Sequence, residues 1–324
     1  MTANDRNHFF QTMANKQRKK KKLTFAVACH EGGDVLGEGA YGTVVASGDV
    51  CKKTMHYAGS DKALNRMIRR ETLFLKTLKR CPTVVDCLHV TPTDFYMPKL
   101  ELNLAQYAAM TASCADYLVN LYVSVILALG HMAEHEIVHM DIKPENVMVN
   151  VSHKCYFVLI DFGRAQWLDE QGVVSDQNPV PCGAYVCDSP ENLNMVLRGL
   201  KKEPVSPHLF CDGRHDLYSL GLLLLFCIHG RYVNGTKESE QWCSDLAVVE
   251  SVVRKINARA AMPTQEQFKI EKNALLIASK GASNETRLTA LQRIVFDHLL
   301  QPLPGERNDV DWYLGTVEWY LQGL

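Results

Sequence analysis

The sequence predicts an α+β fold of two lobes, a small β-rich lobe followed by a larger helical one. Short β-branched segments separated by glycines fill residues 31–56, and one helical pattern follows them. From about residue 101 onward helical patterns dominate. We therefore expect the smaller lobe over about residues 30–98 and the larger lobe over about 101–322.

The composition is that of an ordinary globular protein, and 324 residues are enough for a sizeable core. The formal net charge of -1 argues against a surface devoted to nucleic acid, so we expect no specific nucleic-acid binding. Eleven cysteines without any CxxC pair indicate reduced thiols in an intracellular protein. The apolar stretch 117–133 carries polar residues and is short for a bilayer, so it predicts a buried helix and no membrane partner.

Residues 1–29 are predicted to form a basic, disordered leader without an apolar signal-peptide core. Within it, "KQRKKKK" (16–22) is either a solvated charge run or a nuclear-import signal. We expect the protein in the nucleus, the cytoplasm or both.

The first strands carry glycines in a G-x-G-x-x-G pattern, at Gly37, Gly39 and Gly42. A β-branched segment follows instead of a helix, so the glycines join two antiparallel strands and do not open a dinucleotide-binding unit. A Walker A loop is excluded because no Gly-Lys-Ser/Thr closes the motif. Such a hairpin lets the backbone approach phosphates closely, although a purely structural hairpin is the alternative.

A helix is predicted over residues 60–80, with Ser60 or Asp61 as its N-cap. Its apolar positions recur at three- and four-residue steps, at Leu64, Ile68, Leu75 and Leu78. The preceding strand supplies "VCKK", and a lysine there can reach nucleotide phosphates while Glu71 on the helix holds it. "FYMPKLEL" (95–102) then reads as a strand that leaves the small lobe.

The loop "IVHMDIKPENVMVN" (137–150) holds the polar residues that phosphoryl transfer needs. Asp141 can accept or orient a hydroxyl proton, and Lys143 can stabilise the transferring group. Asn146 can bind a metal ion. Asp161 follows an apolar strand in "VLIDFGRA", where its carboxylate can bind Mg²⁺.

In their order and spacing these motifs resemble those of eukaryotic-type protein kinases, over roughly residues 30–322. Lys143 in "DIKPEN" is typical of the serine/threonine branch. The resemblance implies that Asp216 in "DLYSLG" braces the catalytic loop and that Arg307 pairs with Glu191 of "SPE". The hinge and the compact second lobe are also similar to kinases of large DNA viruses.

The resemblance further implies the substrates and the nucleotide pocket. ATP, Mg²⁺ and protein substrates are expected, with Asn146 and Asp161 as the metal ligands and Met97 as the gatekeeper of the pocket. The remaining residues expected to contact nucleotide are Leu36, Gly37, Gly39, Gly42, Val44, Pro98, Leu100 and Met148.

Two lysines compete for the phosphate-binding role. Strand alternation puts Lys53 on one face with Cys51 and Met55, a small residue before it and an apolar one after it, which suits the pocket. A second lysine directly after the catalytic one is typical of the family, which favours Lys52. We favour Lys53.

Several positions depart from the kinase pattern. Met140 replaces the usual Arg before Asp141, Ala184 replaces a Thr, and Cys187 replaces a Tyr. Residues 192–215 form a long insert, which we expect to be solvated; contact between its basic residues and acidic substrates is the alternative. No metal ligand, phosphate lysine or catalytic Asp is lost, so we expect an active kinase, with a pseudokinase scaffold as the alternative and a small-molecule kinase as the weaker third.

Met140 has a predicted consequence for the activation segment. In kinases with the usual Arg, that guanidinium binds a phosphate on this segment. Met140 cannot, and Ser175 is the only plausible regulatory site between Asp161 and Glu191. We expect packing to hold the segment, with Met140 filling apolar space beneath it.

One further motif, "HMAEH" (131–135), fits the zinc-binding pattern H-x-x-E-H. It ends a predicted helix just before the kinase-like loop. The sequence identifies no third ligand, so the motif is interpreted as an ordinary helix end.

Overall fold

The structure is a computed structural model, and several segments, including the leader 1–29, Ser60, Ser175 and Ala184, lie outside the residues that it describes. The residues it describes are 33–39, 42–56, 61–110, 115–150, 156–174, 185–203, 212–234, 250–251, 253–254, 291, 294–301 and 304–321.

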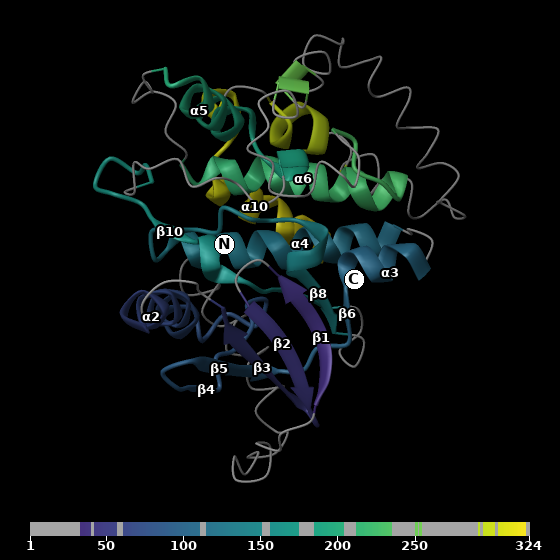
Figure 1. Ribbon diagram of the computed structural model, residues 1–324. Coiled ribbons are helices and arrows are strands. Elements are labelled where there is room, and N and C mark those ends of the chain that lie inside the picture. The colour runs from purple at the N-terminus through teal and green to yellow at the C-terminus, as the bar shows by residue number, and fades with distance from the viewer. Residues whose placement is uncertain are drawn as a thin grey trace.

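The N-terminal part is a five-stranded antiparallel sheet in the order β1-β2-β3-β5-β4 (Figure 1). Gly48 adopts a φ of 59° in the tight turn between β2 and β3, which an L-side chain rarely adopts. A Cβ on Gly42 would lie 2.5 Å from the Thr54 carbonyl oxygen, so only glycine fits there. The strands are β1 (Asp34–Gly39), β2 (Gly42–Ser47), β3 (Val50–Met55), β4 (His89–Val90) and β5 (Asp94–Pro98).

Helix α2 (Asp61–Thr77) lies beside this sheet (Figure 1). Its amphipathic pattern buries Ile68, Phe74 and Leu75. The helix also contacts the short 3-10 turn η4 (Phe162–Arg164), which comes from the other part of the chain. Helix α2 thus joins the two parts.

Among the residues that the structure describes, helices form most of the C-terminal part, as the sequence predicts. Helix α4 (Ala115–Ala133) is its core element and lies among α10 and α6 (Figure 1). It also packs against strand β9. The other longer helices and turns described there are α3 (Leu104–Met110), η5 (Tyr185–Cys187), α5 (Pro190–Lys201), α6 (Arg214–His229), η8 (Ile294–Leu299), η9 (Pro304–Glu306) and α10 (Val310–Leu321).

The apolar stretch of α4 is long enough to cross a membrane by length and composition. However, 78% of Asp116–Ala133 is buried inside the protein, as in the core helix of a globular domain. The stretch therefore gives no indication of a membrane protein.

Two small sheets frame the central loops. In one, β8 (Val147–Asn150) pairs with β6 (Leu102–Asn103) and β9 (Tyr156–Leu159); in the other, β7 (Ile137–Val138) pairs with β10 (Gln166–Trp167). The polar loop with its 3-10 turn η2 (Pro144–Asn146) therefore runs from β7 to β8. Asp161 comes just after β9, so the pairing of β8 with β9 holds the two functional segments next to each other.

The predicted insert at 192–215 is not a wholly solvated segment. Residues 192–201 belong to helix α5, and Leu193 and Val196 are buried. The apolar residues of this segment recur at helical spacing, a pattern that the interpretation as a solvated insert did not take into account. This spacing is the physical reason that one face of the helix is buried. Residues 204–211 lie outside the part of the chain that the structure describes.

Candidate active site

Strand β3 delivers one of its two lysines into the interior. Lys53 is only 8% exposed, and its Nζ lies 2.9 and 3.2 Å from the carboxylate oxygens of Glu71 and 2.8 Å from Oδ1 of Asp161. Lys52 lies on the opposite face of the strand and is half-buried. The structure thus places Lys53, and not Lys52, beside Glu71 and Asp161.

The charges of this cluster stabilise one another. Burial alone would lower the pKa of Lys53, but the carboxylates of Asp161 and Glu71 raise it above its ordinary value. Burial alone would likewise raise the pKa of Asp161, whereas the Lys53 ammonium lowers it to about 2. Lys53 is therefore a cation and Asp161 an anion across the neutral pH range.

Asp161 occupies an unusual backbone conformation. Its φ of 62° and ψ of 73° lie in the left-handed region, which costs a non-glycine residue on the order of 1 kcal/mol. A Cβ at Gly163 would approach the Asp161 Oδ1 to 3.2 Å, so the small residue leaves room for the carboxylate. The Asp161 side chain keeps 41% of its surface exposed, and so a ligand can reach it.

The loop between β7 and β8 gathers a second polar group around Asp141. The Nζ of Lys143 lies 3.1 and 2.9 Å from the two carboxylate oxygens of Asp141. Asn146 donates through Nδ2 to the Asp141 backbone oxygen at 2.9 Å and to Oδ2 at 2.8 Å. Burial would lower the pKa of Lys143, but the Asp141 charge raises it, so this lysine is also a cation.

Asp216 of α6 holds the backbone of this loop. The amide nitrogens of His139 and Met140 donate to its carboxylate at 2.6 and 3.0 Å. Met140 has a φ of 64°, another left-handed position, and these two bonds hold it there. Burial raises the pKa of Asp216 to about 7, while the two N–H donors favour its charged form.

His139 connects the loop to the segment that carries Asp161. Its Nε2–H donates to the carbonyl of Ile160 at 3.1 Å, and its ring packs edge-on against Phe162 with centroids 4.6 Å apart. Burial lowers the pKa of His139, so the ring is neutral. These contacts fix the position of Asp161 relative to Asp141.

The Met140 side chain points into an apolar cluster and not into a polar pocket. It is 9% exposed and packs with Val138, Val174 and Met195, and Leu168 flanks them. Val174 belongs to the segment after Asp161 and Met195 to α5. Met140 thus fills apolar space beside the segment after Asp161, as the sequence predicts, and its contact with Met195 of α5 is an addition that the sequence did not indicate.

The residues predicted to contact nucleotide lie on both parts of the fold. Val44 pairs with Lys53 across β2 and β3, and Pro98 pairs with Val50 across β3 and β5. Met97 is buried opposite Cys51. The others lie on β1 (Leu36, Gly37, Gly39), at the start of β2 (Gly42), just after β5 (Leu100) and on β8 (Met148).

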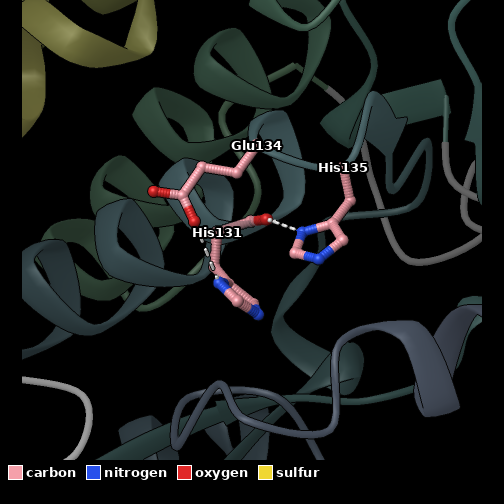
Figure 2. Close-up of side chains that lie close together, drawn as sticks. All are labelled: His131, Glu134 and His135. Carbon is pink, nitrogen blue, oxygen red and sulfur yellow. Dashed lines mark hydrogen bonds and ion pairs between the residues drawn. The ribbon is translucent and has the colours of Figure 1, made fainter. Parts of the chain in front are cut away.

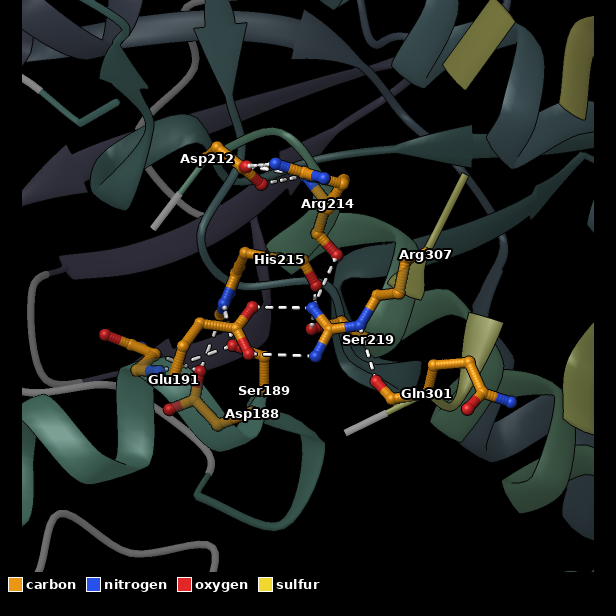
Figure 3. A network of polar contacts seen from close by, with 10 residues as sticks. Asp188, Ser189, Glu191, Asp212, Arg214, His215, Ser219, Gln301 and Arg307 are labelled. Atoms are coloured by element: carbon orange, nitrogen blue, oxygen red, sulfur yellow. Dashed lines mark hydrogen bonds and ion pairs between the residues drawn. The ribbon is translucent and has the colours of Figure 1, made fainter. Parts of the chain in front are cut away.

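Glu191 and Arg307 form a buried ion pair at the start of α5 (Figure 3). The two guanidinium nitrogens of Arg307 donate to the two carboxylate oxygens at 2.6 and 2.9 Å. Arg307 also donates to the Gln301 carbonyl at 2.7 Å, which ties the C-terminal segment to this point. The pairing of these residues implied by the family resemblance is present.

Two contacts that position the site carry no motif, and the sequence did not indicate them. Arg70 donates to the Gln166 side chain at 2.5 Å, and Phe74 stacks on Trp167 with ring centroids 4.0 Å apart. Both link α2 to β10. The apolar positions predicted for this helix did not include Phe74, and only the fold shows that it is buried and which ring it contacts.

Comparison with known proteins identifies the fold family. The model of the protein kinase domain matches residues 30–299. Serine/threonine-protein kinase PKH2 of Saccharomyces cerevisiae is 26% identical over 224 residues, 61% of this chain and 19% of the relative. Mitogen-activated protein kinase 13 of Bos taurus is 28% identical over 177 residues, 50% of this chain and 46% of the relative.

A third relative, serine/threonine-protein kinase Kist of Homo sapiens, is 28% identical over 142 residues, 43% of this chain and 32% of the relative. The chain spans less than half the length of each of these three relatives. The domain match, by contrast, covers most of this chain, with the β-rich and helical parts in the predicted order. The chain therefore belongs to the protein kinase family.

Proposed function

We propose that this protein transfers the γ-phosphate of Mg·ATP to serine or threonine hydroxyls of protein substrates. The observation that carries the proposal is the assembled charge cluster, in which Lys53 contacts both Glu71 and Asp161. Asp141, Lys143 and Asn146 form the second half of the same arrangement. Phosphoryl transfer requires positioned charges and a group on the nucleophile, and these residues provide both.

Each residue has a role that its contacts support. Lys53, held by Glu71, is positioned to bind phosphate oxygens. Asp141 is positioned to orient the substrate hydroxyl and to take up its proton at a carboxylate oxygen. Lys143 neutralises charge near Asp141 and so favours the transferring group there.

The donor set also fits a magnesium ion. Mg²⁺ prefers oxygen ligands, and bound there it neutralises charge on the phosphates. Asp161 supplies a partly exposed carboxylate. Asn146 uses its amide nitrogen to hold Asp141, so its amide oxygen is the atom that remains suited to a metal. The residues present thus fit the ion.

Nucleotide binding without turnover is the alternative. Met140 and Ala184 replace residues typical of active kinases, and the identity to known kinases is low. A scaffold of this kind would bind Mg·ATP yet transfer nothing.

The experiment that tests the proposal is a transfer assay on a degenerate peptide library with radiolabelled ATP. We expect label on serine and threonine only, and only when Mg²⁺ or a similar divalent ion is present. Nucleotide binding is measured in parallel by calorimetry. Tight binding with no transfer to any peptide would replace the proposal by the scaffold alternative.

A further inference from the structure

The end of α4 brings together three side chains that can bind a metal ion, His131, Glu134 and His135 (Figure 2). One ligand atom from each lies within 4.8 Å of the others. The sequence showed two histidines of an H-x-x-E-H pattern without a third ligand. The structure places the glutamate of that pattern beside both imidazoles.

One distance in this cluster matches the spacing of two ligand atoms around a tetrahedral ion. Nδ1 of His131 lies 3.4 Å from Oε2 of Glu134. Two ligand atoms that are each about 2.1 Å from a tetrahedral zinc ion lie about 3.4 Å apart. This pair therefore already has the spacing that a shared ion requires.

A hydrogen bond to the backbone orients the ring of His135, the remaining ligand. Its Nδ1–H donates to the carbonyl oxygen of His131 at 2.9 Å, and a carbonyl can only accept. The lone pair of the neutral ring is therefore on Nε2. Metal-binding histidines commonly donate their second nitrogen in this way, because the bond fixes both tautomer and ring orientation.

The turn that carries these residues is well ordered by hydrogen bonds. The amides of Glu134 and His135 donate to the carbonyls of Gly130 and Met132 at 3.1 and 3.0 Å. The carbonyl of Glu136 accepts from the amide of Leu168 at 2.7 Å, beside strand β10. Glu134 is exposed, so an ion can enter from solvent without unfolding of the helix.

We propose that His131, Glu134 and His135 form a site for a divalent transition-metal ion of the zinc class, with water as the fourth ligand. Two imidazoles and one carboxylate suit such ions better than Mg²⁺, which prefers oxygen ligands alone. The site is thus chemically separate from the magnesium ligands proposed above. The ion would clamp the last turn of α4 to the turn that leads into β7, six residues before Asp141. Its role is structural, because it binds the folded chain and thereby stabilises it.

The test is metal titration of the full chain after chelator treatment, followed by calorimetry and by Co²⁺ absorption. We expect saturable Zn²⁺ binding, a thermal midpoint that rises with Zn²⁺, and a tetrahedral Co²⁺ spectrum without a sulfur-to-metal band. His135→Gln and Glu134→Gln should each weaken binding by at least about tenfold, since even loss of an outer partner costs about 10–100-fold. His89→Gln, at the exposed start of β4, is the matched control and should leave the affinity unchanged.

Three outcomes would overturn the proposal. These are the absence of saturable binding, a cobalt spectrum with thiolate bands, and unchanged affinity in both variants. Glu134→Gln keeps the shape of an exposed side chain, so this variant carries the test if His135→Gln fails to fold. None of these measurements depends on kinase activity.

Discussion

Two neighbouring lysines show how strongly a single side-chain direction determines a role. Lys53 faces inward and meets two carboxylates, whereas Lys52 lies on the other face of the same strand. Because strand residues alternate, a shift of one position would reverse the two. Met140, in the loop after β7, is an apolar side chain at a position where an arginine is usual, and it packs into an apolar cluster.

The lysine assignment predicts an asymmetric pair of variants. Lys53→Met should lower the rate of transfer by about 10²-fold or more, the typical cost of removing one preorganised electrostatic contact. It should also lower the thermal midpoint, because Glu71 is left buried without its cation. Lys52→Met serves as the matched control and should weaken activity only slightly. If Lys52→Met is the inactive variant, the assignment is reversed.

From the apolar surroundings of Met140 we predict an enzyme that is active without phosphate on its activation segment. Apolar packing of Met140 against Val174 and Met195 holds the activation segment in place, as a phosphate bound to an arginine would otherwise do. Phosphatase treatment and Ser175→Ala should therefore leave the rate nearly unchanged in a steady-state assay. A drop of more than about tenfold, roughly 1.4 kcal/mol of barrier, would contradict this account.

At the scale of elements, the pairing of Glu191 with Arg307 joins α5 to the C-terminal segment, and a polar network surrounds it (Figure 3). His215, at the start of α6, bonds through Nδ1 with the Ser189 hydroxyl at 2.8 Å, and its Nε2 lies 3.6 Å from Asp188. The other charged or titratable groups that act on His215 are Glu191, Arg307, Asp212 and His139.

This network predicts a pH dependence of stability. Burial lowers the pKa of His215 to about 4. Between that value and about 6.5 the imidazole is protonated in the unfolded chain but not in the folded chain. The unfolding free energy therefore decreases as the pH is lowered through this window, by up to about 3 kcal/mol. His215→Gln should flatten part of this slope in urea unfolding at a series of pH values. The exposed His89→Gln is the control, and an unchanged slope in His215→Gln would disprove the account.

The elements also show which features can be predicted from sequence. The glycines, the strand alternation and the period of α2 are local signals, so the first three strands and that helix were predictable. The motifs around Asp141 and Asp161 were readable for the same reason. The helical course of 192–201 was also marked by a local amphipathic pattern, which the insert interpretation missed, whereas the stacking of Phe74 on Trp167 and similar contacts depend on partners far away in sequence. No local pattern specifies such partners.

At the scale of the whole molecule, the site exists only where the two parts meet. Lys53 comes from the N-terminal sheet and Glu71 from α2, whereas Asp161 follows β9 of the C-terminal part. The bond between Lys53 and Asp161 therefore bridges the parts.

The basic run 16–22 should affect where the protein is located and not its catalysis. Its seven positions hold six Lys or Arg residues, a composition typical of nuclear-import signals. Replacing the run with a Gly/Ser segment of equal length should shift a fluorescent fusion from nucleus to cytoplasm and leave catalysis unchanged. The same distribution in both fusions would reduce the run to a solubilising leader.

The loop around Asp141 should be a working catalytic site, and one pair of proteins is enough to check this. The rate of phosphoryl transfer and the affinity for Mg·ATP are determined for the original chain and for Asp141→Asn. We expect Asp141→Asn to lower the rate by about 10²–10⁴-fold, because a positioned acid–base group is removed, with nucleotide affinity nearly unchanged. A chain whose transfer rate is the same with and without this substitution would contradict it.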